Sequence, residues 1–361
     1  MSEISSVIVI GPFPPPLHGQ ALTNRSVAEG IVERGVGCVI INTAPPSLKK
    51  SIWARLQRLP RLVIGLVKYA KALSESPRAV YLSVSGGYGQ VYEVIFILAA
   101  RIFRVDIFIR HCCFSYLDSR RFIASVLVFI AGRDAVHVTQ CGAMSAALKR
   151  FYRAKKVIDV SNAALVPLSA HHRPVRSALS LGLLSNLQPD KGVFEFLEIF
   201  KRLQARGHSV AAHLAGPIQD EVVLDAVTEL ADASDDFTYW GGIYDEERKD
   251  EFFAAIDLFV FLTTYKNETE AKVNLESMAH GVPVISTDIG CISSVIGLGG
   301  GHVVASGGEE GVDAVVDLVE MYCSGEHCLE RASKSANSRF EVLRAGSVDA
   351  WKEFWHLLLR D

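Results

Sequence analysis

The sequence lacks the long apolar run and the basic leader that would direct a protein into or across a membrane. No stretch of about eighteen residues, the length that a spanning helix needs, is both apolar and free of charges. The nearest candidate, residues 84–100, contains Glu93 and is followed by Arg101 and Arg104. The first residues show no basic cluster ahead of an apolar segment. We therefore expect the protein to act in the cytoplasm.

Patterns that hold metal ions or dinucleotides are missing as well. The seven cysteines and eleven histidines show no zinc-like spacing, and Cys112 and Cys113 are simply adjacent. No D-x-D aspartate pair follows a strand-like run, and the chain has no G-x-G-x-x-G loop of the dinucleotide-binding type. We expect neither a structural nor a catalytic metal.

Length and charge point to a globular chain of two domains with opposite charge. The 361 residues exceed what one hydrophobic core usually fills, and 49% of them are hydrophobic against 21% charged. The net charge of -3 is uneven, because residues 1–176 contain 23 Lys and Arg against 9 Asp and Glu, whereas the remainder contains 14 against 31. A cationic half of this kind attracts anionic partners such as phospholipid or a diphosphate-linked acceptor.

The basic residues concentrate in residues 53–72, where apolar side chains recur at near-helical spacing. Such a segment suits an anionic membrane surface, but it equally suits a helix that faces the core and exposes a solvated basic side. Pro60 should break or kink the element. Nucleic acid is a weaker candidate partner, because aromatic residues are not interleaved with the basic ones as stacking platforms require.

Strand-like runs alternate with helical stretches throughout, which predicts parallel sheets covered by helices on both faces. Six such runs lie before residue 163 and six follow residue 178. We expect two doubly wound domains, residues 1–172 and 178–344, joined by a linker at 171–177, with ligands bound in a central cleft. The final segment, residues 345–361, reads as an amphipathic helix.

Two glutamates, Glu268 and Glu276, are the most informative candidate site residues. A strand is expected at 256–262, a loop at 263–269, a helix at 271–280 and another strand at 282–288, so the pair falls at the carboxyl edge of a parallel sheet. In a continuous helix their spacing would be roughly 12 Å, enough for one carboxylate to hold a ribose and the other a second sugar. The alternative is that both are solvated residues of a helix face.

The string LESMAHGVPVIST, residues 275–287, together with Glu268 resembles the E-x7-E signature of retaining glycosyltransferases of family four. The resemblance implies the GT-B fold, two Rossmann-like domains facing a central cleft. It also implies that Glu276 binds the ribose hydroxyls of a nucleotide and that Glu268 binds the transferred sugar. Val273 and Asn274 are assigned to the donor side with Glu276. The chain departs from the family at Thr269–Lys272, where G-F-G is common.

The loop at residues 11–21, GPFPPPLHGQA, is a candidate phosphate site. Gly19 stands just before a helix expected from Ala21, where backbone N–H groups can face an anion. The alternative is a proline-stiffened turn. The loop also resembles the first loop of the same family, which closes over the donor diphosphate and the acceptor, so we assign Gly19 to the donor and His18 to the acceptor.

A second candidate phosphate ligand is Lys191, at the start of a helix expected near Gly192, where the helix dipole already favours an anion. The alternative is an ordinary surface lysine. The family usually has the sequence G-R-L-x-x-x-K-G at this place, and Ser185 and Asn186 replace its glycine and arginine. The missing arginine removes a bidentate phosphate clamp, and we hypothesise that Lys272 or Arg110 compensates.

Two further assignments depend on the resemblance. His111 falls where the family often has a histidine that contacts the donor sugar or orients the acceptor, although a lone histidine is otherwise often a buried core residue. Gly216, in HLAGP, matches a loop that lines the nucleotide through its backbone. With Arg110 on the acceptor side, the predicted catalytic residues are Glu268, His111 and Lys191, and the donor residues are Gly19, Asn186, Lys191, Gly216, Lys272, Val273, Asn274 and Glu276.

The resulting hypothesis is a retaining, metal-independent glycosyltransferase of cell-surface polysaccharide assembly. It would move a sugar from a UDP- or GDP-linked donor, without a further cofactor, to a saccharide acceptor that is expected to be lipid-linked. The protein would then act in the cytoplasm or on the inner membrane face. Two alternatives stay open: a nucleotide-sugar epimerase or phosphorylase of the same fold, and a non-catalytic subunit of a glycosyltransferase complex.

Overall fold

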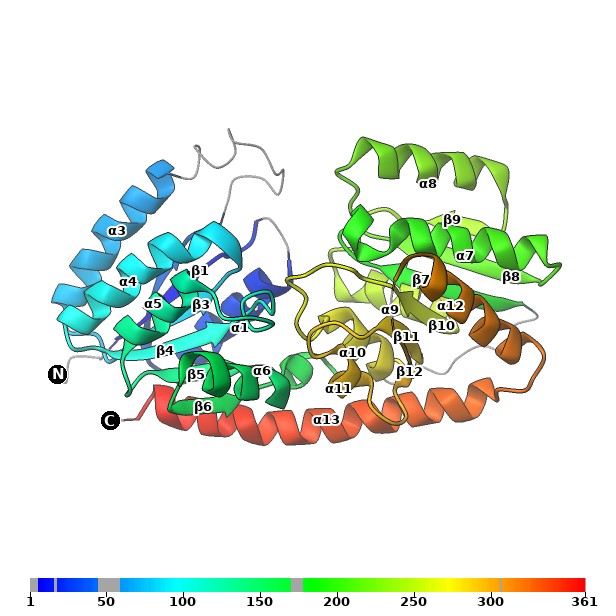
Figure 1. Cartoon of the computed structure of the whole chain (residues 1–361). Helices are drawn as coiled ribbons and strands as arrows, with labels where there is room; N and C mark the ends of the chain where they lie inside the picture. The colour runs from blue at the N-terminus through cyan, green and yellow to red at the C-terminus, as the bar shows by residue number, and fades with distance from the viewer. Residues whose placement is uncertain (1–5, 16–17, 45–58, 170–177, 306, 361) are drawn as a thin grey trace. The chain divides into compact units, whose positions relative to one another are not determined.

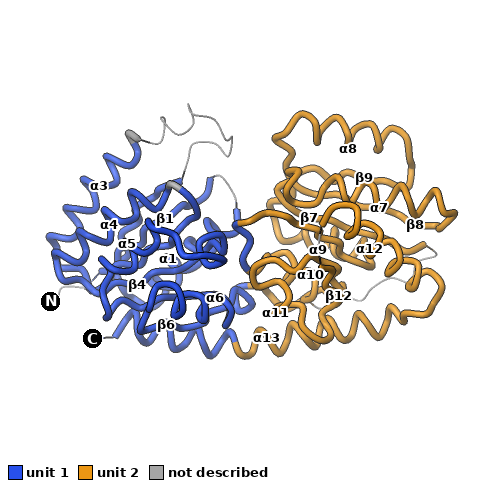
Figure 2. The backbone as a smooth tube through the Cα atoms, viewed as in Figure 1, with its two compact units in different colours: residues 1–165, 267–269, 347–361 blue, residues 166–266, 270–346 orange. Residues whose placement is uncertain are grey.

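The computed structural model describes residues 6–15, 18–44, 59–169, 178–305 and 307–360. They form two compact units (Figure 2). Unit 1 comprises Met1–Leu165, Asn267–Thr269 and Ser347–Asp361, and unit 2 comprises Val166–Lys266 and Glu270–Gly346. The sequence predicted that the first domain ends at residue 172, a few residues after Leu165. The predicted linker at 171–177 lies outside the described residues.

Unit 1 is a six-stranded parallel sheet in the order β2-β1-β3-β4-β5-β6 (Figure 1). Its apolar runs form strands because both faces of the sheet are covered, and Val7, Ile8 and Val9 are fully buried in β1. The strands are β1 Ser6–Gly11, β2 Gly37–Asn42, β3 Ala79–Val84, β4 Asp106–His111, β5 Val136–Thr139 and β6 Lys156–Asp159. The helices are α1 Gly19–Glu33, α3 Leu59–Ser74, α4 Gln90–Ile102, α5 Phe122–Ala131 and α6 Gly142–Ala147.

One face of this sheet is covered by α1 and by the end of the last helix, α13 Leu329–Leu358. Val27 and Ile31 of α1 share a buried cluster with Trp351 and Phe354 of α13. The chain moves from β1 to β2 toward one edge of the sheet, and from β2 through β3 and β4 to β5 toward the other edge. Because such crossovers are right-handed, the helices α3, α4 and α5 in the second series lie on the face opposite to α1. The residues from Ser347 onward therefore belong to unit 1 through packing of aromatic side chains.

The described part of α3 begins at Leu59 and contains Pro60 as its second residue. The other part of the predicted basic segment, residues 53–58, lies outside the described residues. None of the described helices combines the length and apolarity needed to cross a membrane.

Unit 2 repeats the architecture with a sheet in the order β12-β11-β10-β7-β8-β9, again parallel. Its strands are β7 Leu179–Leu184, β8 Val210–Ala215, β9 Phe237–Tyr239, β10 Leu258–Phe261, β11 Val284–Thr287 and β12 Gly301–Val304. Its helices are α7 Val193–Ala205, α8 Glu221–Ala233, α9 Glu246–Ala255, α10 Lys272–Ala279, α11 Ile292–Ile296, α12 Gly308–Cys323 and the first part of α13. The expected α/β class with two parallel sheets is confirmed.

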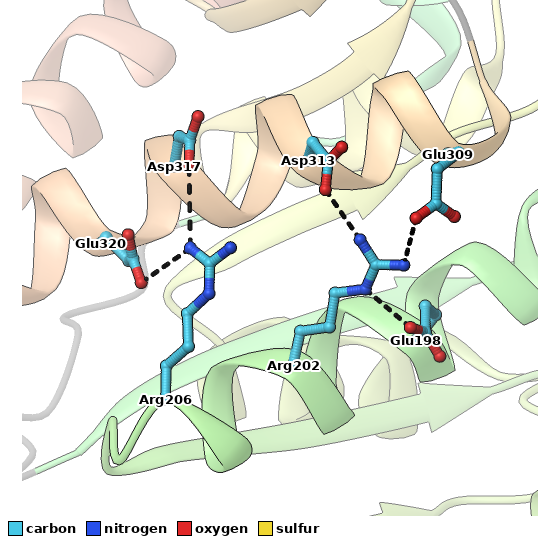
Figure 3. A network of polar contacts seen from close by, with 7 residues as sticks. All are labelled: Glu198, Arg202, Arg206, Glu309, Asp313, Asp317 and Glu320. Atoms are coloured by element: carbon cyan, nitrogen blue, oxygen red, sulfur yellow. Dashed lines mark hydrogen bonds and ion pairs between the residues drawn. The ribbon is translucent and has the colours of Figure 1, made fainter.

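Ion pairs join α7 to α12 on the surface of unit 2 (Figure 3). The Arg202 guanidinium lies 2.6 Å from Glu309 and 2.7 Å from Asp313, and Arg206 lies 3.1 Å from Glu320. Hydrogen bonds to Glu198 and Glu309 raise the pKa of Arg202. Glu309 and Asp313 are exposed, and exposed ion pairs contribute little to the free energy of unfolding. The network therefore mainly orients α7 and α12 relative to each other.

Candidate functional site

The carboxyl ends of β7 and β10 are tied together in unit 2. The Thr263 hydroxyl donates to the carbonyl oxygen of Asp190 at 3.2 Å, and the backbone N–H of Thr264 donates to the same oxygen at 3.0 Å. The turn that carries Lys191 is therefore held against the loop that leads to Glu268. This is the edge at which parallel sheets bind ligands.

Lys191 is positioned by the glycine that follows it. Gly192 has φ +78°, and a Cβ there would lie 2.7 Å from the carbonyl oxygen of Leu262, so no other residue fits without a shift of the backbone. Gly192 is the N-cap of α7, which begins at Val193. The Lys191 ammonium lies 4.1 Å from the ring centroid of Tyr265, a cation–π contact that directs it toward the β10–α10 loop.

The start of α10 is strained. Ala271, its N-cap, has φ 48° and ψ 80°, a left-handed conformation that costs a non-glycine residue of the order of 1 kcal/mol or more. The first turn of α10 carries no acidic side chain that would repel an anion at the helix start. Strain of this kind persists only where the surrounding structure imposes it.

Asn274 lies in the first turn of α10 and is completely buried. Among the described residues, neither its amide nitrogen nor its amide oxygen has a hydrogen-bond partner. A buried polar group without a partner costs about 1–3 kcal/mol, and native proteins retain few of them. Asn274 thus offers one donor and one acceptor at the position where the resemblance expects a nucleotide.

Glu276 is held by two lysines. Its carboxylate lies 3.1 Å from the Lys249 ammonium and 3.5 Å from that of Lys272, and only 9% of its side chain is exposed. Burial lowers the pKa of Lys249, but the nearby Glu276 and Glu246 carboxylates outweigh it and raise the pKa. The predicted phosphate ligand Lys272 therefore also contacts Glu276, and the carboxylate is oriented from two sides.

Sequence reasoning missed Lys249. It lies on α9, nineteen residues before Glu268, within EERKDEFFAA, which has the composition of an ordinary charged surface helix. Only the packing of α9 against α10 brings it to Glu276. The same packing places the His280 ring 2.8 Å from Asp250 of α9.

Gly216 and Asn186 lie at the neighbouring strand ends. Gly216 has φ +127°, and a Cβ would lie 1.7 Å from the carbonyl oxygen of Ser185, so the β7 and β8 ends can approach only because this residue is glycine. Asn186 follows Ser185 and is half-buried. Unit 2 thus gathers Lys191, Asn186 and Gly216 at one sheet edge, while Lys272, Val273, Asn274 and Glu276 share α10.

In unit 1, His18 and Gly19 begin α1 as the sequence predicted, although the helix starts two residues earlier than Ala21. The backbone N–H of Ala21 donates to His18 Nδ1 at 3.4 Å, which caps the helix, and burial lowers the pKa of His18. Gly19 is exposed, and a Cβ at this position would meet nothing within 4 Å. The helix start is open to solvent.

Arg110 does not lie on an accessible surface. It is fully buried at the end of the central strand β4, where its guanidinium donates to the carbonyl oxygen of Val160 at 3.0 Å and to Asn162 Oδ1 at 2.9 Å. Its burial gives no support to the assignment of Arg110 to the acceptor side or to its role as a substitute phosphate clamp. In unit 1 the residue joins β4 to the end of β6.

His111 occupies the position of a buried core histidine, the alternative that the sequence left open. Its ring contacts Tyr116 Oη at 2.8 Å and His137 Nδ1 at 3.0 Å. Burial and the neighbouring His137 hold the pKa of His111 well below its usual range, so the pair is neutral. With 1% of the residue exposed, its proposed contact with a sugar finds no support in unit 1.

The neutral histidine pair should make unit 1 sensitive to acid. Burial lowers the pKa of His137 to about 4, below the value of about 6.5 in an unfolded chain. The unfolded chain therefore takes up a proton that folded unit 1 does not, so this stability is complete above pH 6.5 and is lost as the pH falls toward 4. Between pH 7.5 and pH 5 we expect His137 to cost about 2 kcal/mol of unfolding free energy.

Urea unfolding measures this loss in a Trp53→Phe/Trp240→Phe background, whose remaining tryptophans, Trp351 and Trp355, lie in unit 1 and report on it by fluorescence. His137→Gln should reduce the loss between pH 7.5 and pH 5 by about 2 kcal/mol and leave the part that the buried His111 causes, whereas His356→Gln, at an exposed position of α13, should leave the loss as in the wild type. A His137→Gln protein that loses as much unfolding free energy as the wild type would show that other groups cause the acid sensitivity.

Glu268 is half-buried in the segment Asn267–Thr269, which groups with unit 1, whereas Glu276 belongs to unit 2. The Cys113 thiol donates to Asn267 Oδ1 at 3.0 Å, which fixes the residue before Glu268. Among the described residues, no three His, Cys, Asp or Glu side chains cluster closely enough to hold a metal ion.

Comparison with known proteins matches residues 179–338 to the family described as "Glycosyl transferases group 1". Over 195 residues the chain is 24% identical to the capsular polysaccharide biosynthesis glycosyltransferase CapM of Staphylococcus aureus, an alignment covering 51% of this chain and 46% of that protein. The aligned region thus spans about half the length of this relative.

Two solved structures are similar over nearly the whole chain. HepE of Anabaena, in complex with UDP and glucose, has a TM-score of 0.66 at 15% identity and covers 98% of this chain and 99% of its own. Sucrose-phosphate synthase of Thermosynechococcus elongatus has a TM-score of 0.71 at 13% identity, covering 99% and 100%. These likenesses show that the chain has the GT-B fold, which confirms the expected fold class.

Proposed function

We propose that this protein is a glycosyltransferase that takes a sugar from a nucleoside diphosphate donor and transfers it with retention of configuration. The observation that carries the proposal is the α10 start, where the unpartnered, buried Asn274 and the doubly held Glu276 share one helix. That helix lies inside the range that matches the glycosyl transferases group 1 family. UDP is the first nucleotide to test, because the similar HepE binds it.

In this proposal the ribose, the diphosphate and the sugar of the nucleotide-sugar donor each have a protein partner. Glu276 accepts hydrogen bonds from the ribose hydroxyls, while Asn274, the free N–H groups of α10 and Lys191 contact the diphosphate or the nucleoside. Lys272, beside Glu276, supplies positive charge that the absent arginine would otherwise provide. Glu268 holds hydroxyls of the sugar.

Transfer then proceeds on one face of the sugar. The acceptor oxygen bonds to the anomeric carbon as the bond to the diphosphate oxygen breaks, and the acceptor proton passes to that leaving oxygen. No protein general base is required, so catalysis consists of positioning and of stabilising the charge that develops on the diphosphate. His111 has no direct part in this mechanism, and neither does a metal ion.

The acceptor that we propose is a saccharide carried on a lipid diphosphate, used in cell-surface polysaccharide assembly at the inner membrane face. Two observations support it. Residues 1–176 carry 23 Lys and Arg against 9 Asp and Glu, which favours an anionic acceptor. The similar CapM is named for capsular polysaccharide biosynthesis.

A donor screen tests the proposal. The protein is incubated with UDP- and GDP-sugars, and nucleotide release and thermal unfolding are measured for each. We expect one nucleotide to raise the unfolding temperature by several degrees and its cognate sugar donor to be hydrolysed slowly without an acceptor. If no donor shifts the unfolding temperature and none releases nucleotide, the non-catalytic alternative is favoured instead.

A further inference from the structure

Exposed apolar side chains gather on α4 and α5 of unit 1, two helices that pack beside each other (Figure 1). Phe122 and Phe129, at the two ends of α5, are 82% and 85% exposed. Such exposure is unusual for large apolar residues unless the surface meets a partner. We call the following set the apolar face: Val91, Ile95, Leu98, Ile102, Phe103, Phe122 and Phe129.

On α4 the exposed residues form a stripe opposite the buried side of the helix. Val91, Ile95, Leu98 and Ile102 recur at intervals of three and four, which places them on one face. The side of α4 that packs on the unit already buries Phe96, Ile97 and Ala100. The helix is thus apolar on two sides, more than its place in the unit requires. α3, beside α4, adds the exposed Val63, Ile64 and Val67.

The exposed charges on the helices that carry the apolar face have one sign. In α3, α4 and α5 together the only acidic residue is Glu93, which is buried and accepts a hydrogen bond from the Ser85 hydroxyl at 2.7 Å. The exposed carboxylates nearest in sequence lie beyond the helix ends: Glu75, Asp106, Asp118 and Asp134. Exposed basic residues on these helices and just beyond their ends form a basic rim: Arg61, Lys68, Lys71, Arg101, Arg104, Arg120 and Arg121.

We propose that the apolar face with its basic rim is a docking surface for an anionic lipid bilayer. Phe122, Phe129 and the α4 stripe enter the boundary between headgroups and acyl chains, and the basic rim binds lipid phosphates. A second copy of the chain fits less well, because a symmetric dimer through this face would set one basic rim against the other. The inference stands on this surface alone and does not depend on the transferase activity.

Sedimentation of the full chain with vesicles tests the proposal. Vesicles of phosphatidylcholine alone are compared with vesicles containing about one third phosphatidylglycerol, at low and high salt. We expect the protein to sediment with the anionic vesicles and to be released by high salt, since surface charges are screened. The double variant Phe122→Ser/Phe129→Ser should bind at least about tenfold more weakly, and Lys68→Gln/Lys71→Gln should lower anionic binding by more than about fivefold.

The matched control is Val222→Ser/Leu298→Ser, which removes two exposed apolar side chains from unit 2 and should leave vesicle binding unchanged. All three variants change exposed residues, so their unfolding temperatures should equal that of the wild type. Failure of the wild type to bind anionic vesicles, or full binding by the phenylalanine variant, would overturn the proposal. So would a dimer, seen by light scattering without lipid, that this variant abolishes.

Discussion

Replacing Glu268 with glutamine is expected to lower kcat for sugar transfer by about 100-fold or more, with less than about a threefold change in the Kd of the nucleoside diphosphate. Glutamine keeps the size of the side chain and removes its charge. In the proposed mechanism Glu268 contacts only the sugar, so its loss misplaces the anomeric carbon without affecting the nucleotide. Steady-state transfer rates and calorimetric titration of UDP alone separate the two effects.

The corresponding change at Glu276 should act on binding instead. Glu276→Gln removes the charged acceptor of the ribose hydroxyls, an interaction of about 1.5–3 kcal/mol, and should raise the Kd of UDP by about 10- to 100-fold. The two motif glutamates therefore predict opposite patterns in the same pair of assays. If both variants lose affinity equally, or if both keep wild-type transfer, the division of roles between sugar and ribose is wrong.

Glu246→Gln is the matched control for Glu276→Gln. Glu246 lies 2.9 Å from the same Lys249 ammonium that contacts Glu276, but its carboxylate is exposed. Both changes remove a carboxylate from Lys249, and only one removes the proposed ribose ligand. Glu246→Gln should leave UDP affinity within about twofold of the wild type, because exposed ion pairs contribute little. A loss as large as that of Glu276→Gln would mean that the effect is transmitted through Lys249.

The fold was predictable because its signals are local. Each of the twelve apolar runs is short, lies between turn residues and forms a strand, since buried parallel strands need no alternation of polar residues. The α10 segment was predictable for the same reason, and the helix at Lys272–Ala279 falls within the expected 271–280. Gly281 and Pro283 mark where it stops.

The site was only partly predictable, because burial at a strand end depends on what packs over it. Arg110 and His111 end β4, as ligand residues often do, but β4 lies between β3 and β5 in the sheet. Tyr116 and His137 cover His111, and Asn162 accepts one hydrogen bond from Arg110. The spacing of Tyr116, His137 and Asn162 in the sequence does not predict that they contact the end of β4.

Replacing Asn274 with leucine is expected to stabilise unit 2 by about 1–2 kcal/mol and to raise the Kd of UDP at least about tenfold. Leucine has nearly the same shape as asparagine and needs no hydrogen bond. Since neither amide atom of Asn274 has a partner among the described residues, the substitution removes a desolvation cost without removing a bond. The gain in stability and the loss of UDP affinity together are informative, because replacing a residue with only a structural role would lower both the stability and the affinity.

Asn24→Leu is the matched control for this second prediction. Asn24 is equally buried, but its amide nitrogen donates to the carbonyl oxygen of Pro12 at 2.9 Å and to the Ser83 hydroxyl at 2.8 Å. The same substitution there should destabilise unit 1 by about 1–3 kcal/mol, because it removes two buried hydrogen bonds and leaves the carbonyl oxygen of Pro12 without this donor. Urea unfolding measures both changes by tryptophan fluorescence, with Trp240 reporting on unit 2 and with Trp351 and Trp355 reporting on unit 1, each in a background in which the other tryptophans are replaced by phenylalanine.

The comparison of the two asparagines separates a ligand group from a packing group. If Asn274→Leu is destabilised as much as Asn24→Leu, the amide has a structural partner and the argument for a donor site at α10 fails. If it is stabilised but binds UDP as well as the wild type, the site does not hold the nucleotide. Only higher stability combined with weaker binding fits a residue whose hydrogen bonds are completed by the donor, since that residue lowers the stability of the free protein in order to bind.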